Sequence, residues 1–411
     1  MVLLEDRGRV GHIVRAVELS GDTPAPDAVR DAAARVQLAH EILQVTISNR
    51  DADLWFASIP DTPKPAVTVV HRENSRTVHD VVEFELNRPF PRGELPWRIS
   101  IVLRDGDPDW ELVTACHHCI ADGRSLALLS ERIILAIGAS PTEDASSPRL
   151  VPPAIETIAS LPIRSYIEGD RIDEFVRRQA ILRSSTREFV IPSSSFDGPS
   201  RTSALRVVIS MADERALHAW CRRHRVTAHA AIGAALLLGG ADVLGSNGSA
   251  LLTTTVDLRR FATGPASVHE VAMYSSGVRT AHAVANTGIE ALSLAVAAAT
   301  RDALRAGDAL ASLLLQEASV DYYLQAREPA FAWLSSLGLL SQTIGHRAVR
   351  GAFGGVPVHA YGPMIYVQAI AVGTALSGMF LYPDPLVDSL IVRDIAIAWS
   401  DRLRSLLEAP E

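Results

Sequence analysis

Two adjacent histidines, a carboxylate and a glycine lie within seven residues of this sequence, in the segment CHHCIADG at residues 116–123. Histidine is the side chain whose ordinary pKa lies closest to neutral pH, so it can take up and return a proton without a large shift. Successive side chains of a strand face opposite ways, so His117 and His118 should have different roles. We expect one ring to point into a cleft and the other to be held in the packed interior.

Two other interpretations of this segment are a metal site and a pair of core histidines. Cys116, His117, His118 and Cys119 are all possible ligands, but four consecutive residues of an extended chain cannot converge on one tetrahedral ion. No second Cys/His cluster completes such a site. A core pair is the plainer explanation of two adjacent histidines, and the adjoining DG dipeptide at 122–123 favours a functional site instead.

The elements around the segment should place the histidines at the end of a β-hairpin. An apolar run at 97–103 is followed by the turn-forming sequence DGDPD at 105–109 and by a second apolar run at 110–116. This pattern predicts two paired strands. Gly123 permits a tight turn, and residues 124–135 have the apolar spacing of an amphipathic helix. Asp122 would then cap this helix or take an arginine partner.

The spacing of His117, His118, Asp122 and Gly123 resembles the HHxxxDG signature of one superfamily. This is the condensation-domain and chloramphenicol-acetyltransferase-like acyltransferase superfamily. It includes nonribosomal peptide condensation domains, the plant BAHD enzymes and the polyketide-associated (Pap) acyltransferases. In that family the second histidine is the base and the aspartate is mainly structural, paired with an arginine. The resemblance therefore implies that His118 is catalytic and that His117, Asp122 and Gly123 organise the active site.

Other segments resemble the same family in the expected order. They are a strand at 13–21 leading to a helix at 26–38, the sequence HEILQVTI at 40–47, a strand at 205–209, a helix at 212–224, the segment RVTAHAA at 225–231, and a strand at 253–259 that ends in VDLR. Glu41 and Gln44 depart from the family's HPxLR pattern. The BAHD motif DFGWG is absent, and only SSLG at 335–338 approaches the family's Ser-Asn-Leu-Gly element.

Three residues of the second half are further candidates. An unpaired buried carboxylate is costly, and the resemblance implies that an arginine pairs with the aspartate. Arg259 is the candidate partner of Asp122, and a solvated arginine at a strand end is the alternative. The tetrahedral intermediate of acyl transfer needs hydrogen-bond donors for its oxyanion. Ser275 and Ser276 are candidates for this role, with a polar strand end beside a turn as the alternative.

The expected fold class is α/β, with mixed sheets. The resemblance implies two chloramphenicol-acetyltransferase-like subdomains with an active-site tunnel at their interface. We expect an N-terminal subdomain at 1–150, a connector at 151–200 and a C-terminal subdomain at 201–411, with paired strands at 363–371 and 373–382. The glycine-rich stretch 239–248 lacks a phosphate-loop lysine and is predicted to be a loop. No GxSxG nucleophile elbow is present.

Composition excludes several classes of function. The chain has 411 residues, a formal net charge of −8 and three cysteines. The charge argues against a nucleic-acid or anionic-membrane surface, and the few cysteines argue against a disulfide framework. The first residues include charged side chains and lack the apolar core of a signal peptide. The apolar stretch 228–240 is too short to span a bilayer. We expect a cytoplasmic monomer with no transmembrane segment, no metal and no nucleic-acid partner.

The resemblance to free-standing Pap-type enzymes implies an acyltransferase. It would move an acyl group from an acyl carrier protein or coenzyme A thioester to a hydroxyl group of a small-molecule acceptor. No bound cofactor is expected, because acyl-CoA or the phosphopantetheine-linked acyl group is a co-substrate. Amide formation with an amine acceptor is one alternative. A catalytically inactive relative that only docks a carrier protein is the other.

Overall fold

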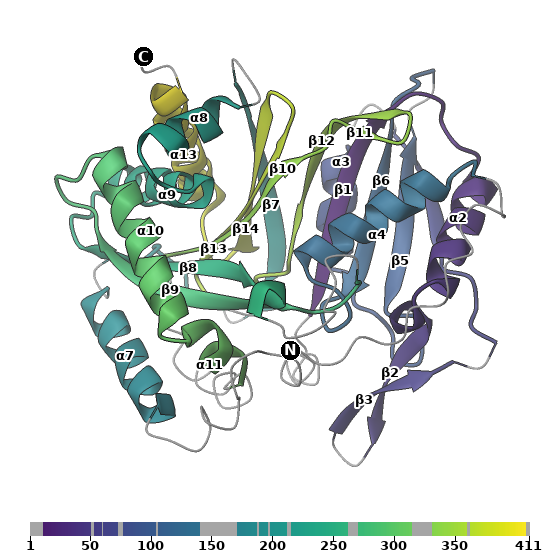
Figure 1. The fold of residues 1–411 in the computed structure, drawn as a ribbon, viewed down its shortest axis with the longest axis horizontal. Coiled ribbons are helices and arrows are strands. Elements are labelled where there is room, and N and C mark those ends of the chain that lie inside the picture. The colour runs from purple at the N-terminus through teal and green to yellow at the C-terminus, as the bar shows by residue number, and fades with distance from the viewer. Residues whose placement is uncertain are drawn as a thin grey trace. The chain divides into compact units, whose positions relative to one another are not determined.

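The computed structural model describes residues 11–50, 53–59, 61–72, 77–103, 106–139, 171–186, 189–195, 198–211, 215–261, 270–314, 331–359 and 362–407. They form two compact α/β units, each built on a mixed six-stranded sheet (Figure 1). The first unit takes its described residues from 11–139, 270–274 and 341–357. The second takes them from 171–261, 275–340 and 358–407.

The sheet of the first unit has the strand order β11-β12-β1-β6-β5-β4. All neighbouring strands are antiparallel except β4 and β5. The strands are β1 (His12–Ser20), β4 (Val67–His71), β5 (Trp97–Leu103), β6 (Trp110–His117), β11 (Thr343–Ile344) and β12 (Arg347–Gly355), and a separate hairpin joins β2 (Val45–Arg50) to β3 (Asp53–Ser58).

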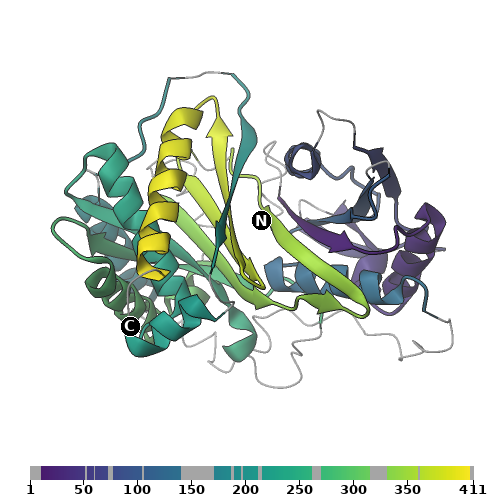
Figure 2. The same cartoon turned by 90° about the horizontal axis from the view of Figure 1, so that it is seen from above.

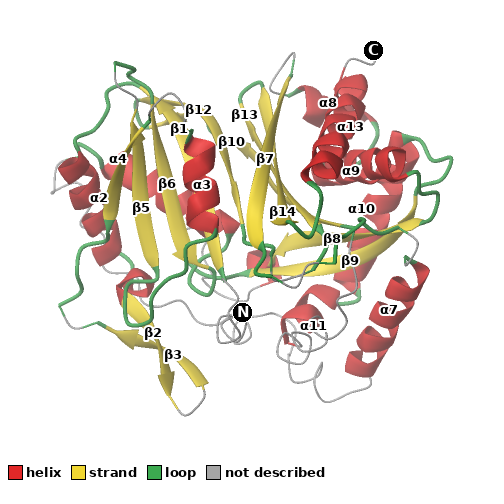
Figure 3. Cartoon of the chain, turned by 180° about the vertical axis from the view of Figure 1, so that it is seen from behind, coloured by secondary structure: helices red, strands yellow, loops and turns green. Residues whose placement is uncertain are grey.

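Helices cover both faces of this sheet, as comparison of Figures 1 and 3 shows. On one face lies α4 (Gly123–Ala136), against which α2 (Pro26–Leu38) packs. On the other face lies α3 (Val78–Leu86). The Ser130 hydroxyl of α4 donates to Thr114 Oγ1 of β6 at 3.2 Å, whereas His12 Nε2 of β1 lies 2.7 Å from the Glu85 carbonyl of α3. These two contacts tie the sheet to the helices on its two faces.

The sheet of the second unit has the order β7-β14-β13-β10-β8-β9, in which β10 runs parallel to both β13 and β8. Helices α9 and α13 pack together on one face, with α10 beside them (Figure 2). The elements are α7 (Arg171–Ser185), β7 (Arg201–Ser210), α8 (Ala216–Arg223), α9 (Ala228–Leu244), β8 (Ser249–Asp257), β9 (Ser275–Ala283), α10 (Ile289–Arg305), α11 (Asp308–Leu314), β10 (Ala332–Leu340), β13 (Ile365–Val372), β14 (Ala375–Asp384) and α13 (Ser389–Leu407).

The local elements expected from the sequence are largely present. The predicted hairpin is β5 and β6, paired antiparallel, and the predicted helices at 26–38 and 124–135 are α2 and α4. The paired strands expected at 363–371 and 373–382 are β13 and β14. The N-terminal segment 1–7, the Pro/Ser-rich boundary at 140–150 and the part of the connector at 151–170 lie outside the described residues.

Long-range packing changes the linear division of the chain. The C-terminal subdomain was expected to hold all residues from 201 onward, but residues 270–274 and 341–357 belong to the first unit. The physical reason is backbone pairing, because β12 hydrogen-bonds to β1 from Val14↔Gly355 to Ser20↔Ala348. Residues 270–274 are held in the first unit by hydrogen bonds to Asp122 and Ser125 at the start of α4.

Two further predictions are corrected. The strand ending in VDLR stops at Asp257, and Leu258–Phe261 forms a short 3₁₀ turn, η2. Gly239 and Gly240 lie inside α9 and not in a loop, and Gly245 ends the helix as a left-handed C-cap with φ 61°. Glycine is used inside α9 because a β-carbon at Gly239 would lie 2.9 Å from the backbone nitrogen of Trp399 in α13.

Among the described helices, no single one is long and apolar enough to cross a membrane. One pair, α8 with α9, meets that test jointly by length and composition, with a bend of 93° between the two.

The close approach of α9 and α13 predicts that Gly239→Ala destabilises the protein by about 1–3 kcal/mol, because backbone atoms must move to admit the methyl group. The gain in helix propensity, about 1 kcal/mol, acts in the opposite direction. Gly233→Ala is the control in the same helix, since its nearest neighbour is the flexible end of Leu252 at 3.1 Å. Urea unfolding of both variants checks this, and equal stabilities would contradict it.

Candidate active site

The histidine pair sits where β6 ends. Backbone hydrogen bonds hold both residues within the first unit: the His117 N–H donates to the Pro96 carbonyl at 2.7 Å and the His118 N–H to the Gly11 carbonyl at 2.8 Å. His117 is the last residue of β6 and is fully buried, while His118 begins the following turn and is partly exposed. The two rings therefore have different surroundings, as the strand alternation predicts.

The inner ring, His117, is held by its own loop. Its Nδ1 accepts a hydrogen bond from the Cys119 N–H at 3.2 Å. An accepting Nδ1 leaves the proton of a neutral imidazole on Nε2. Burial also raises the pKa of the adjacent Cys116 thiol, which keeps this residue in its unreactive protonated form. His117 and Cys116 are thus part of the packed layer beneath the loop.

A buried ion pair that was not predicted from the sequence lies against this inner ring. Arg98 Nε lies 2.5 Å from Glu85 Oε2, and both side chains are nearly inaccessible. The Arg98 guanidinium stacks over Phe90 at 4.1 Å, and the Phe90 ring contacts His117 with 6.4 Å between ring centroids. The available signal was the presence of Arg98 and Ser100 in β5, whose other residues are apolar. This cluster supports the strand end that carries the histidines.

The outer ring, His118, is the one available for chemistry. It makes no hydrogen bond to any other described residue. Burial lowers the pKa of His118, while its own backbone carbonyl and the Asp122 carboxylate act to raise it and His117 acts to lower it. The lowering by burial predominates, so the imidazole is neutral at pH 7. A general base requires a neutral imidazole whose ring can accept a proton from the substrate, and hydrogen bonds to other residues would compete with this.

Asp122 organises the loop that follows. Its side chain is buried, and each carboxylate oxygen accepts a backbone hydrogen bond: Oδ1 from Ser125 at 2.8 Å and Oδ2 from Tyr274 at 2.9 Å. The Asp122 N–H donates to the Ala272 carbonyl at 3.1 Å. The first bond caps α4, because it satisfies an N–H that has no partner within the helix. The others fasten residues 272–274 to the histidine loop.

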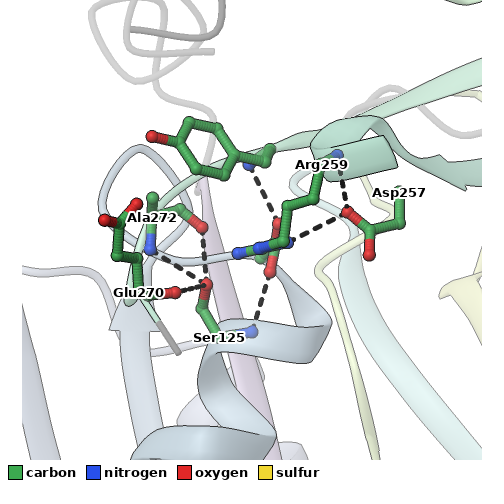
Figure 4. Close-up of polar contacts among 7 residues, drawn as sticks. Ser125, Asp257, Arg259, Glu270 and Ala272 are labelled. Atoms are coloured by element: carbon green, nitrogen blue, oxygen red, sulfur yellow. Dashed lines mark hydrogen bonds and ion pairs between the residues drawn. The ribbon is translucent and has the colours of Figure 1, made fainter. Parts of the chain in front are cut away.

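Ser125 strengthens the same junction. Its hydroxyl lies 2.6 Å from the Ala272 carbonyl and 2.9 Å from the Ala272 N–H, and also approaches the Glu270 carbonyl at 3.4 Å (Figure 4). Gly123 is the first residue of α4 and has no positive φ. The freedom of glycine to adopt a left-handed turn is therefore not used here. No sequence signal identified residues 270–274 as part of the site, because the segment has no motif of its own.

Arg259 lies in the second unit and is buried. Its backbone N–H and its Nη1 both donate to Asp257 Oδ1, at 3.0 and 3.1 Å (Figure 4). Arg259 is thus not the solvated strand-end arginine of the alternative interpretation. Its pairing with Asp122 stays a prediction.

The two candidate oxyanion donors differ in their surroundings. Ser276 is buried, and its hydroxyl donates to the Ala309 carbonyl of α11 at 2.7 Å. A hydroxyl has one proton, so this bond occupies the only donor of Ser276. Ser275, the first residue of β9, faces the opposite side of the strand and is partly exposed. Their role as oxyanion donors stays a prediction.

Comparison with known structures identifies the fold. The polyketide synthase associated protein 5 from Mycobacterium tuberculosis superposes with a TM-score of 0.70 at 16% sequence identity, covering 97% of this chain and 94% of that chain. Trichothecene 15-O-acetyltransferase from Fusarium sporotrichioides superposes with a TM-score of 0.77 at 13% sequence identity, covering 96% of this chain and 92% of that chain. The epimerization domain from the third module of tyrocidine synthetase B superposes with a TM-score of 0.67 at 14% sequence identity, covering 97% of this chain and 93% of that chain.

The chain therefore has the fold of the condensation-domain and chloramphenicol-acetyltransferase-like superfamily, and the resemblance predicted from HHxxxDG is confirmed. Residues 198–343 match the family described as phthiocerol/phthiodiolone dimycocerosyl transferase C-terminus. A search of curated protein sequences finds no match. The neighbours include an acetyltransferase and an epimerization domain, so the fold by itself does not specify the reaction.

The geometry of Asp122 predicts that Asp122→Ala lowers the free energy of unfolding by about 2–4 kcal/mol, because two buried backbone N–H groups lose their acceptors. Urea unfolding measures the change. Asp302→Ala is the matched control, since its side chain is 70% exposed and its ion pair with Arg305 spans 3.8 Å; it should change stability by less than about 0.5 kcal/mol. Similar effects of both substitutions would show that Asp122 has no organising role.

Proposed function

We propose that this protein is an acyltransferase that moves an acyl group from a coenzyme A or carrier-protein thioester to a hydroxyl acceptor, with His118 as the general base. The observation that carries the proposal is the state of His118. Backbone hydrogen bonding holds it at the end of β6, its ring makes no hydrogen bond to another described residue, and burial lowers its pKa. The match of residues 198–343 to the dimycocerosyl transferase family supports the transferase class.

The reaction follows from this geometry. The neutral His118 ring takes the proton of the acceptor hydroxyl as its oxygen attacks the thioester carbonyl carbon. The resulting tetrahedral intermediate collapses with cleavage of the carbon–sulfur bond. The imidazolium then returns the proton to the departing thiolate, so that the ester and a free thiol leave and His118 is again neutral. No covalent acyl-enzyme is needed, and Asp122 contributes by holding the loop and by favouring the protonated ring electrostatically.

Transfer to oxygen is favoured over transfer to nitrogen by the described family and by the likeness to an O-acetyltransferase. An amide-forming condensation enzyme would use the same base with an amine acceptor. A catalytically inactive relative would bind a carrier protein and leave the thioester intact. Product analysis with alcohol and amine acceptors separates all three.

We expect His118→Ala to lower the rate of ester formation by about 10²–10⁴-fold, the usual contribution of a positioned general base. Stability should change little, because the ring is partly exposed and makes no hydrogen bond to another described residue. The measurement is mass-spectrometric detection of product from a panel of acyl-CoA donors with a long-chain alcohol. His346→Ala is the control, since His346 is an exposed histidine. Undiminished turnover in a folded His118→Ala protein would refute the assignment.

The pH profile offers an independent check. The base must be unprotonated, and burial lowers the pKa of His118 from 6.5. The acid limb of kcat/KM should therefore have a midpoint below pH 6.5. Asp122→Asn removes a negative charge that raises the pKa of His118, so the midpoint should move to still lower pH. The midpoint does not depend on the fraction of folded enzyme, and a shift toward higher pH in this variant would contradict the assigned electrostatics.

A further inference from the structure

A buried side-chain amide oxygen with no hydrogen-bond partner among the described residues lies in the sheet of the second unit. Gln368 of β13 is only 3% exposed, and its Oε1 accepts no hydrogen bond from any described residue. Buried amides are almost always hydrogen-bonded, because an unpaired one loses its interactions with water and gains nothing in exchange. Such a group needs an explanation, and an unfilled place for a ligand is a physical one.

The sheet face to which Gln368 belongs is the one away from the helices. Its neighbours in the strand, Val367 and Ala369, are part of the core beneath α9 and α13. Side chains alternate along a strand, so Gln368 points to the opposite side. Its register partners, Ser335 of β10 and Met379 of β14, point the same way. Ser335 is also buried, and no hydrogen bond of its hydroxyl to a described residue is present.

The flanking row of the same face is aromatic. Trp333 and Tyr366 are register partners two residues before Ser335 and Gln368, with 6.0 Å between their ring centroids. The Trp333 indole N–H donates to Thr255 Oγ1 at 2.8 Å, which fixes the ring on this face. An apolar surface thus leads to a small polar group made of one amide and one hydroxyl.

A β-bulge sets the end of this row. The pairing of β10 with β13 shifts register between Ser336 and Gly338, and Gly338 has φ 76°. Only glycine adopts this conformation readily, which explains the glycine of the SSLG sequence. Beyond the bulge Gly338 pairs with Ile370, so the next residue of β10 on the face of Trp333 and Ser335 is a glycine, which has no side chain. Bulges of this kind commonly re-aim side chains near functional sites.

We propose that Gln368, with Ser335, forms a subsite that recognises an uncharged hydrogen-bonding group of a substrate, either a secondary amide or a hydroxyl. A primary amide presents a donor and an acceptor side by side, which suits a partner carrying both. A thioester donor supplies such a group in the amides of its pantetheine arm, and an acceptor supplies it in a hydroxyl remote from the reacting one. This inference rests on the proposed acyl transfer and makes Gln368 a specificity-determining residue of that reaction.

The test is Gln368→Met, which keeps the length of the side chain and removes the amide. Without substrate, the melting temperature should stay the same or rise, because an unpaired buried amide is lost. With substrates, KM for either the donor or the acceptor should rise about tenfold, with kcat changed much less. The substrate whose KM rises identifies the source of the recognised group. Ser335→Ala should raise the KM of the same substrate, and it serves if Gln368→Met fails to fold.

Gln37→Met is the matched control. Gln37 is an equally buried amide at 3% exposure, but its Nε2 donates to the Leu43 carbonyl at 3.2 Å. This variant should lower the melting temperature and leave both KM values unchanged. If Gln368→Met instead destabilises as Gln37→Met does, with both KM values unchanged, Gln368 is structural and the subsite is refuted.

Direct measurement of ligand binding distinguishes failure of the proposed acyl transfer from failure of the proposed subsite. If the wild type transfers no acyl group, the proposed function fails, and thermal shifts with coenzyme A and with 1,2-octanediol then decide the subsite. A shift in the wild type that is lost in Gln368→Met supports the subsite. Equal shifts in the two proteins, including none in either, overturn it.

Discussion

The carboxylate of Asp122 is the point on which the candidate site depends. One oxygen accepts the N–H of Ser125 and fixes the start of α4, and the other accepts the N–H of Tyr274, about 150 residues further along the chain. Hydrogen bonds to a charged acceptor are stronger than neutral ones, and burial makes their loss costly. The same charge favours protonation of His118. One side chain therefore holds the shape of the loop and also acts to raise the pKa of its histidine, against the larger lowering by burial.

Features that depend on neighbouring residues were predictable from the sequence. The hairpin of β5 and β6 follows from two apolar runs around DGDPD, and α4 follows from a capping aspartate before an amphipathic stretch. The end of β8 also had a local signal that was missed, since Asp257 Oδ1 accepts the N–H of Arg259 and turns the chain. By contrast, the helical state of Gly239 depends on the closeness of α13, which no local pattern records.

The site was predictable to the extent that its chemistry resides in a motif. The resemblance to HHxxxDG implied the role of His118, and the structure gives the two rings the separate surroundings that strand alternation predicts. Gln368 had only a weak signal, one polar residue within the apolar strand IYVQAIAV. The neighbouring strands decide whether the side chain of such a residue faces water, a hydrogen-bonding residue or no polar group at all. Register with β10 and β14 is a long-range property, and it first becomes visible in the fold.

The pairing of β12 with β1 has a consequence for synthesis on the ribosome. About 330 residues separate the end of β1 from the start of β12. At a translation rate of roughly 5–20 residues per second, β12 is synthesised about 15–65 s after β1. Through that interval one edge of β1 presents unpaired N–H and C=O groups, which are a template for pairing with another chain. The nascent first unit is therefore an incomplete sheet until β12 has been synthesised. Its yield in cells depends on how well that edge is shielded while translation continues.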